Sequence, residues 1–196
     1  MSRIGGAAAL ACAGAAAFGA AAAGETGAIA GRVVTESRLW RQGVVVSLDR
    51  PGLETPLPGP TLEMDQHGVR FVPHVLPVVV GTTVRFLNND PGPHNVYSPE
   101  GRYDLGTWPR GEAREHRFDR PGAYTQLCRI HPEMEAFVVV LDTPFFATSD
   151  ASGAFEIRNV PAGPYELAAW SERFDPVRVD VVVVPGETTE LVVEMP

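Results

Sequence analysis

Four residues of this 196-residue chain have side chains that bind soft metal ions. Cys128, His131 and Met134 share one short segment, and His94 lies upstream on a separate one. The sulfur ligands favour Cu(I), and imidazoles bind both oxidation states of copper. Three strong ligands with a weak axial Met are typical of a blue-copper electron-transfer site. The spacing therefore predicts that these four side chains hold copper. Zinc is the alternative, but it gains little from a thioether and usually takes a fourth strong ligand or water.

The elements that must position these residues are short β-strands. The chain has 20 Gly and 18 Pro, which are too many breakers for a helix bundle, while its 44% apolar content is too high for a disordered chain. Short β-branched runs separated by Pro and Gly turns, with no helical crossover, predict an all-β fold of antiparallel sandwiches. The predicted strands are residues 29–34, 44–48, 78–80, 84–87, 137–141, 165–170, 177–184 and 191–193.

Three segments are predicted to be irregular. Residues 50–60 hold four prolines and two glycines and are predicted to form a linker or long loop. Residues 143–147 are predicted to form a second, shorter junction. Residues 110–117 are short and highly charged, and we expect a loop there.

Several segments around the four residues resemble cupredoxins. Residues 88–96 resemble the first copper-ligand loop of plastocyanins, and residues 121–128 are similar to the strand that leads to the cupredoxin cysteine. Residues 128–134, Cys-x-x-His-Pro-x-Met, are close to the short ligand loop of amicyanin. Residues 73–86 resemble the preceding strand pair, so that the resemblance covers about residues 60–142.

This resemblance implies a Greek-key sandwich that binds copper and carries electrons. It implies that His94, Cys128, His131 and Met134 are the copper ligands, in order and at the family spacing. Asn95 would lie next to the ligands and tie the two ligand loops together. His131 would be the ligand nearest the surface and so the port through which electrons pass.

Other residues near these motifs do not match a ligand position. His67, His74 and His116 are expected to be ordinary surface or loop residues. If one is an exception, we expect it to be His74, because its strand is otherwise apolar. Gln126 departs from the family pattern, since plastocyanins usually carry an aromatic residue there. The departure leaves the ligands untouched but affects the packing around them.

A second resemblance covers the rest of the chain. Residues 149–157 and 159–167 resemble the carboxypeptidase regulatory-like, or transthyretin-like, β-sandwich, and residues 185–191 fit its last hairpin. Too few residues follow Leu141 to complete such a sandwich. Residues 27–33 and 43–48 match its first two strands, so we expect the copper domain to be inserted into the smaller outer sandwich.

The predicted boundaries follow from this insertion. Residues 24–58 would supply the first strands of the outer sandwich, 59–143 the cupredoxin domain, and 144–196 the remainder of the outer sandwich. The alternative is a linear order with an irregular N-terminal extension. Pairing of the segment around Val45 with the C-terminal strands would favour insertion.

The first residues predict export. Residues 1–23 carry one charge, Arg3, and are mostly Ala before a small-residue cleavage site, which is typical of a signal peptide. An uncleaved anchor helix is the alternative, and Cys12 makes a lipoprotein a weaker one. The expected location is periplasmic or secreted. A free thiol is normally oxidised there, so an unpaired Cys128 is expected to be protected, for example by a bound metal.

These features predict a protein that passes single electrons between redox partners such as a cytochrome or a periplasmic dehydrogenase. The alternatives are a copper carrier or storage protein and a structural β-protein with incidental metal. The net charge of −8 argues against nucleic acid as a partner, and membrane contact is expected only if the N-terminal segment is kept. We expect no enzyme activity and no small-molecule substrate, because a four-ligand copper leaves no open position.

Overall fold

Nearly every element of the computed structural model, which describes residues 25–54 and 56–196, is a β-strand. The predicted signal peptide, residues 1–23 with Cys12, lies outside the described residues. Within those residues, no helix has the length and apolar character needed to cross a membrane. The elements are β1 (Thr26–Val34), η1 (Arg38–Trp40), β2 (Val45–Asp49), β3 (Leu62–Gln66), β4 (Phe71–Val72), β5 (Val75–Val79), β6 (Thr83–Asn88), β7 (His94–Ser98), β8 (Tyr103–Trp108), β9 (Ala113–Arg117), β10 (Gly122–Leu127), β11 (Glu135–Leu141), β12 (Phe146–Thr148), β13 (Ala154–Pro161), β14 (Gly163–Trp170), β15 (Val177–Val183) and β16 (Thr188–Glu194).

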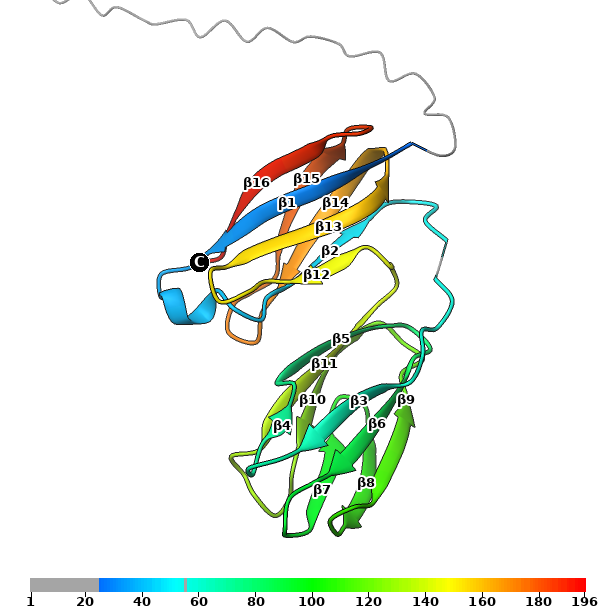
Figure 1. Ribbon diagram of the computed structural model, residues 1–196, viewed down its shortest axis with the longest axis vertical. Coiled ribbons are helices and arrows are strands. Elements are labelled where there is room, and N and C mark those ends of the chain that lie inside the picture. Colours follow the sequence, from blue (N-terminus) through cyan, green and yellow to red (C-terminus); the bar gives the residue numbers. More distant parts are fainter. Residues whose placement is uncertain (1–24, 55) are drawn as a thin grey trace, which may run out of the picture.

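The strands build two sandwiches, which lie end to end in Figure 1. The inner unit, β3–β11, packs a five-stranded sheet of order β5-β11-β10-β7-β8 on a four-stranded sheet of order β4-β3-β6-β9. The outer unit comprises β1, β2 and β12–β16, in sheets of order β13-β1-β16 and β12-β2-β14-β15. The all-β fold class with two sandwiches, predicted from the sequence, is confirmed.

The core of the inner unit follows from alternation along its strands. In β6, Val84 and Phe86 point inward and are fully buried, while Arg85 between them is exposed. Central strand β11 is buried on both faces, at Val138 and Val140 on one and at Val139 on the other, and it pairs with β10 and β5. The buried apolar residues of this unit include Cys128, so the predicted metal site is an extension of the core.

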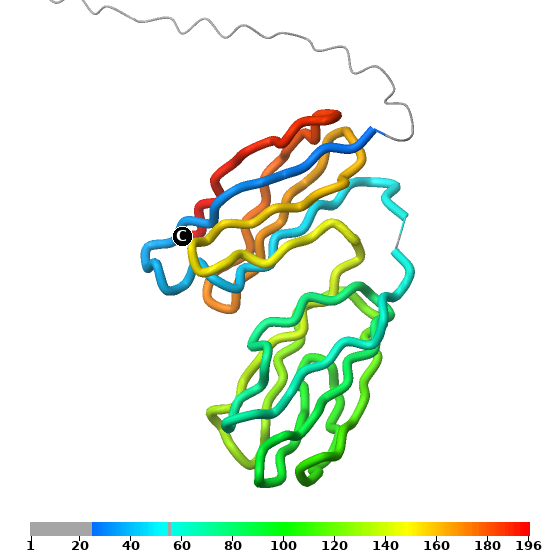
Figure 2. The backbone as a smooth tube through the Cα atoms, in the orientation of Figure 1, coloured from blue at the N-terminus to red at the C-terminus, as the bar shows by residue number. Residues whose placement is uncertain are grey.

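The outer unit joins strands from both ends of the chain. β1 lies between β13, which is antiparallel to it, and β16, which is parallel to it. In the other sheet Val45 of β2 pairs with Trp170 of β14 and with Thr148 of β12. The chain thus leaves this unit after β2 and returns to it at β12, as the tube in Figure 2 shows. This pairing favours insertion over a linear order, while the exact boundaries stay a prediction.

Two predicted loops contain strands. Residues 113–117 form β9, which pairs with β6, although the charged run 110–117 was expected to be a loop. β9 is an edge strand, so the exposed side chains of Glu115 and Arg117 remain solvated without breaking the sheet. The junction 143–147 likewise overlaps the short edge strand β12. The described residues of the predicted linker 50–60 contain no strand.

The two units contact each other around His74. Its Nε2 lies 2.8 Å from Glu172 Oε2 of the outer unit, and its Nδ1 lies 3.1 Å from the carbonyl oxygen of Glu135. Beside it the rings of Phe137 and Trp170 meet across the junction, with centroids 5.5 Å apart. His74 was expected to be either an ordinary surface or loop residue or the exception among the histidines without a ligand role. The structure places it at the contact between the two units.

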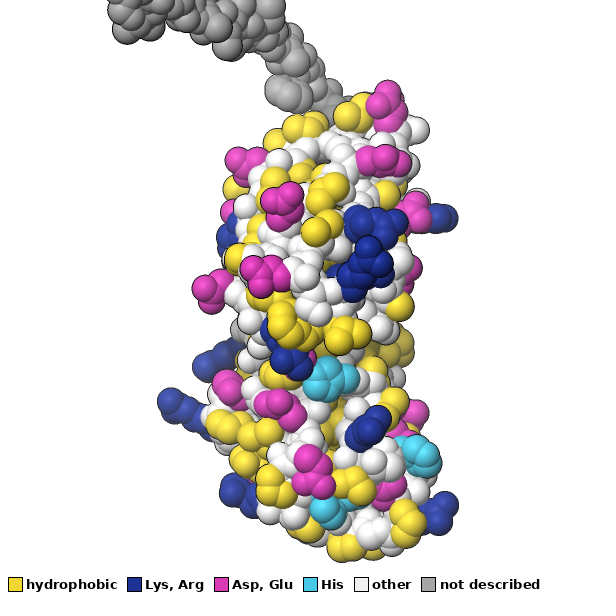
Figure 3. Space-filling view, turned by 90° about the vertical axis from the view of Figure 1, so that its left-hand side faces the viewer, with side chains coloured by type: hydrophobic (Ala, Val, Ile, Leu, Met, Phe, Trp, Pro, Cys, Tyr) yellow, Lys and Arg dark blue, Asp and Glu magenta, His cyan; other side chains and the backbone are white. Residues whose placement is uncertain are grey.

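The surface of the molecule carries both signs of charge. Figure 3 shows acidic and basic side chains interspersed over both units, with no large field of one sign on this face. Histidines gather on the inner unit in this view, as expected from a sequence in which every histidine lies between residues 59 and 143. Mixed charge of this kind does not favour binding to a polyanion.

His116 gives the inner unit a pH-dependent stability. Its ring stacks on Tyr103 at 3.8 Å between centroids, and its burial lowers the pKa of His116 despite the opposing charge of Asp119. Below the ordinary pKa near 6.5, the unfolded chain binds a proton that the folded chain does not. Stability is therefore full above that value and falls as the pH drops below it.

We expect His116→Phe, which keeps an aromatic ring on Tyr103, to flatten the pH dependence of unfolding. The urea midpoint of each protein would be measured at several values between about pH 8 and pH 5. The difference between wild type and variant isolates this residue from the other histidines. Equal pH slopes in the two proteins would contradict the expectation.

Candidate metal centre

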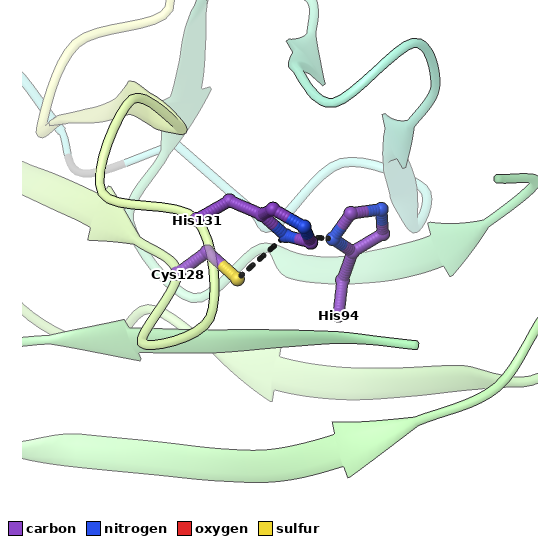
Figure 4. Close-up of side chains that lie close together, drawn as sticks. All are labelled: His94, Cys128 and His131. Atoms are coloured by element: carbon purple, nitrogen blue, oxygen red, sulfur yellow. Dashed lines mark hydrogen bonds between the residues drawn. The ribbon is translucent and has the colours of Figure 1, made fainter. Parts of the chain in front are cut away.

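Three of the four predicted ligands converge at one end of the inner unit (Figure 4). His94 is the first residue of β7, Cys128 follows β10 directly, and His131 lies in the loop between β10 and β11. His94 Nδ1 and His131 Nδ1 are 3.0 Å apart, and Cys128 Sγ is 4.0 Å from His131 Nδ1. One ligand atom from each residue lies within 4.8 Å of the others. Short strand-end loops thus bring distant residues to one point.

Met134 belongs to the same region. Its side chain is buried in the core cluster that contains Cys128, and its N–H donates a hydrogen bond of 3.0 Å to the His131 carbonyl oxygen. This bond closes the loop before β11 begins. That the Met134 thioether completes the donor set stays a prediction from the sequence.

The spacing of the donor atoms fits a single metal ion. Protein metal–nitrogen bonds are about 2.0 Å long and metal–thiolate bonds about 2.3 Å. Two imidazole nitrogens bound to one ion can therefore be separated by up to about 4 Å, and a thiolate and a nitrogen by slightly more. The distances of 3.0 Å and 4.0 Å fall within these limits. The soft thiolate and the two imidazoles match the donor set that copper prefers.

The three donors differ in their access to solvent. His94 and Cys128 are buried, with 1% and 3% of their surface exposed, whereas His131 is only partly buried. Its sequence neighbours Ile130 and Pro132 are exposed. His131 is thus the most accessible of these three donors, and its role as an electron port stays a prediction.

Asn95 connects the two ligand loops. Its backbone N–H points at Cys128 Sγ over 3.5 Å, and its side-chain oxygen accepts a hydrogen bond from the Arg129 N–H at 3.3 Å. Its amide nitrogen donates to Asp104 Oδ1 at 2.7 Å and to the carbonyl oxygen of Gly106 at 2.8 Å. The geometry agrees with the linking role that the family resemblance implies.

Arg129 extends this network on the surface. Its Nε donates to Asp104 Oδ2 at 2.8 Å, and its guanidinium lies 4.2 Å from the centre of the Tyr97 ring. The Arg129 hydrogen bond, followed by those from the Gly106 N–H and Asn95, lowers the pKa of Asp104. Because the pair is exposed, it orients the loop more than it stabilises the fold.

Asp90, which was not among the predicted site residues, lies next to His94. Asp90 Oδ2 is 2.8 Å from His94 Nε2, and both side chains are buried. Burial alone would raise the pKa of Asp90, but hydrogen bonds from Val69, Gly68 and His94 lower it below the ordinary value. The only sequence signal was an acidic residue four positions before His94, within a turn-like Asp-Pro-Gly segment.

Gln126 stands where plastocyanins usually carry an aromatic residue. It is fully buried, its Oε1 accepts a hydrogen bond from the Tyr103 hydroxyl, and its Nε2 donates to the Tyr124 carbonyl oxygen. Tyr103 thus places an aromatic ring beside this position from another strand. Burial, which outweighs the Gln126 hydrogen bond, raises the pKa of Tyr103 well above its ordinary value.

A sequence model of the carboxypeptidase regulatory-like domain matches residues 132–196. This segment starts inside the ligand loop and includes β11, which the structure pairs with β10 and β5 of the inner unit. It omits β1 and β2, which the structure pairs with the strands of the outer unit.

Solved structures similar to this chain include two cupredoxins. A purple cupredoxin from Nitrosopumilus maritimus is 26% identical, with 41% of this chain and 99% of that one covered and a TM-score of 0.38. A reduced amicyanin variant is 23% identical, with 49% and 98% covered and a TM-score of 0.40. A copper-containing nitrite reductase from Thermus scotoductus is 25% identical, with 57% and 28% covered and a TM-score of 0.41. The purple cupredoxin, the amicyanin and the matched domain are of the two kinds that the sequence resembles.

Proposed function

We propose that this chain is a type 1 copper protein that transfers single electrons between redox partners. The observation that carries the proposal is the convergence of His94 Nδ1, His131 Nδ1 and Cys128 Sγ at one end of the inner unit. Met134, which lies in the same core, would supply the axial thioether. Copper bound there would supply a one-electron couple.

The protein's part in this function is to hold the donors still. His94, Cys128 and Met134 lie at the ends of paired strands, and a hydrogen bond from Asn95 reaches the sulfur. Donors fixed in this way move little when the charge at their centre changes, which keeps the cost of reorganisation small. The N–H donated to Cys128 also tunes the thiolate, as hydrogen bonds around such a sulfur do.

Electrons would enter and leave through His131. It is the most exposed of the three converging donors, and the exposed side chain of Ile130 stands beside it. A redox protein such as a cytochrome or a periplasmic dehydrogenase fits this role. We propose a periplasmic or secreted location, which rests on the composition of residues 1–23 and on the need of an unpaired Cys128 for a protecting ligand.

Voltammetry of the copper-loaded protein tests the proposal. Reversible one-electron cycling with one copper per chain is the expected result. Stoichiometric Cu(I) that exchanges readily but does not cycle would favour the copper carrier over the electron carrier. Stoichiometric zinc with no preference for copper would contradict both.

A further inference from the structure

Asp90 is a buried carboxylate in contact with His94. The Oδ2–Nε2 distance is 2.8 Å, and the side chains of Asp90 and His94 are 7% and 2% exposed. The contact is on the far side of the imidazole ring from Nδ1, the atom that faces His131. Water has little access to this pair, so His94 Nε2 depends on Asp90 for its hydrogen bond.

The protein backbone fixes the orientation of this carboxylate. Asp90 Oδ1 accepts the N–H of Gly68 at 2.6 Å, and Oδ2 accepts the N–H of Val69 at 2.8 Å. Val69 has a φ of 56°, a left-handed conformation that a β-branched residue rarely adopts. The Asp90 N–H in turn donates to Asn88 Oδ1 at 3.0 Å. Two loops therefore place the carboxylate before any metal binds.

The chemistry of the pair determines which imidazole nitrogen is free. Both Asp90 oxygens accept backbone N–H groups, and a carboxylate group placed in this way accepts hydrogen bonds, so His94 Nε2 carries the hydrogen. His94 Nδ1 then keeps its lone pair, and it is the nitrogen that lies 3.0 Å from His131 Nδ1 and within 4.8 Å of Cys128 Sγ. A carboxylate behind a metal-ligating histidine fixes its tautomer and raises its basicity.

We propose that Asp90 is a positioning residue of the metal centre, which holds His94 with Nδ1 free and biases bound copper toward Cu(II). The proposal deepens the proposed function and rests on it. The bias follows from charge, because a negative group close to the site and shielded from water stabilises the more highly charged ion. A purely structural Asp90, which only fastens the turn at Gly68 and Val69, would not affect the copper couple.

The test compares Asp90→Asn with the wild type and with Asp119→Asn. Asp119 also carries one negative charge, but it is exposed and paired with Arg117. In the copper-loaded protein we expect Asp90→Asn to raise the reduction potential, with the Cu(II)/Cu(I) equilibrium moved at least tenfold, or about 59 mV for one electron. Asp119→Asn should leave the potential close to that of the wild type. Equal potentials in wild type and Asp90→Asn would overturn the role of Asp90 and leave the copper function intact.

A second measurement on the metal-free wild type covers the case in which Asp90→Asn does not fold. Proton–nitrogen correlation spectra at mildly alkaline pH report which ring nitrogen of His94 carries the hydrogen. We expect the Nε2–H tautomer alone, and a predominant Nδ1–H tautomer would overturn the proposal. A wild type that binds no copper would overturn the proposed function, and the bias toward Cu(II) with it, whatever the tautomer.

Discussion

Replacing Cys128 by Ser is expected to remove the intense visible absorption of the Cu(II) protein and to broaden its copper hyperfine splitting in EPR spectra. Both signatures depend on the thiolate, which Ser does not supply. The Sγ lies 4.0 Å from His131 Nδ1 and accepts the Asn95 N–H, so the substitution acts at the centre of the site. Copper affinity should fall by more than about tenfold, because a weakly bound hydroxyl replaces the soft ligand.

Met64→Leu is the matched control for Cys128→Ser. Met64 is a sulfur-containing residue buried in the same core, but it lies in β3 and is not a predicted ligand. The control should keep the blue band, and circular dichroism should show that both variants remain folded. A Cys128→Ser protein that keeps the blue band would contradict the thiolate site and with it the proposed function.

Phe86→Ala should lower the free energy of unfolding of the inner unit by about 3–5 kcal/mol. Phe86 is fully buried in the core that also contains Cys128 and Met134. Removing its ring leaves a cavity that the paired strands β3 and β9 on either side of β6 cannot close. In the copper-loaded protein, the loss of stability should be measured as a lower temperature at which the blue absorption band disappears on heating.

Leu48→Ala is the control for Phe86→Ala, because Leu48 is fully buried in the core of the outer unit. It should cost about 2–5 kcal/mol in the unfolding of that unit. The cores contain different residues, so the blue band should melt close to its wild-type temperature. Blue-band melting that falls equally in both variants would show that the two units unfold together.

The sequence predicted the donor set because its chemistry is local. Cys128, His131 and Met134 lie within one loop, so their spacing alone restricts where the side chains can go. The link from Asn95 to Arg129 and Cys128 was available only through the family resemblance. Asp90 was missed because its backbone partners Gly68 and Val69 come from a turn about twenty residues earlier. No local pattern shows that the two loops meet.

The strand pattern was predictable where apolar residues dominate and less so at the edges. The predicted strand 84–87 matches β6 because the fully buried Val84 and Phe86 alternate with the less buried Thr83, Arg85 and Leu87. β9 was missed because an edge strand has little buried surface and carries charges freely. The shortage of residues after Leu141 predicted that residues 27–33 belong to the outer sandwich. It did not predict the pairing of β1 with β16, since periodicity carries no information on partners.

The pairing of β1 with β16 has a consequence for the order of folding. β1 cannot complete its sheet until β16, the last strand in the sequence, has been synthesised. Every strand of the inner unit, by contrast, lies between Leu62 and Leu141. Domains generally fold as units during synthesis, so the inner unit can close before β16 exists. In Figures 1 and 2 both connections enter the inner unit on the side that faces the outer unit.

Once folded, the inner unit therefore acts as a short bridge in place of a long loop between β2 and β12. A shorter effective loop reduces the conformational entropy that the chain loses when the outer strands pair. Pairing between strands far apart in the sequence is the slow step in such folds. A chain with a weakened inner unit closes its outer sheets more slowly, although no residue of the outer core has changed.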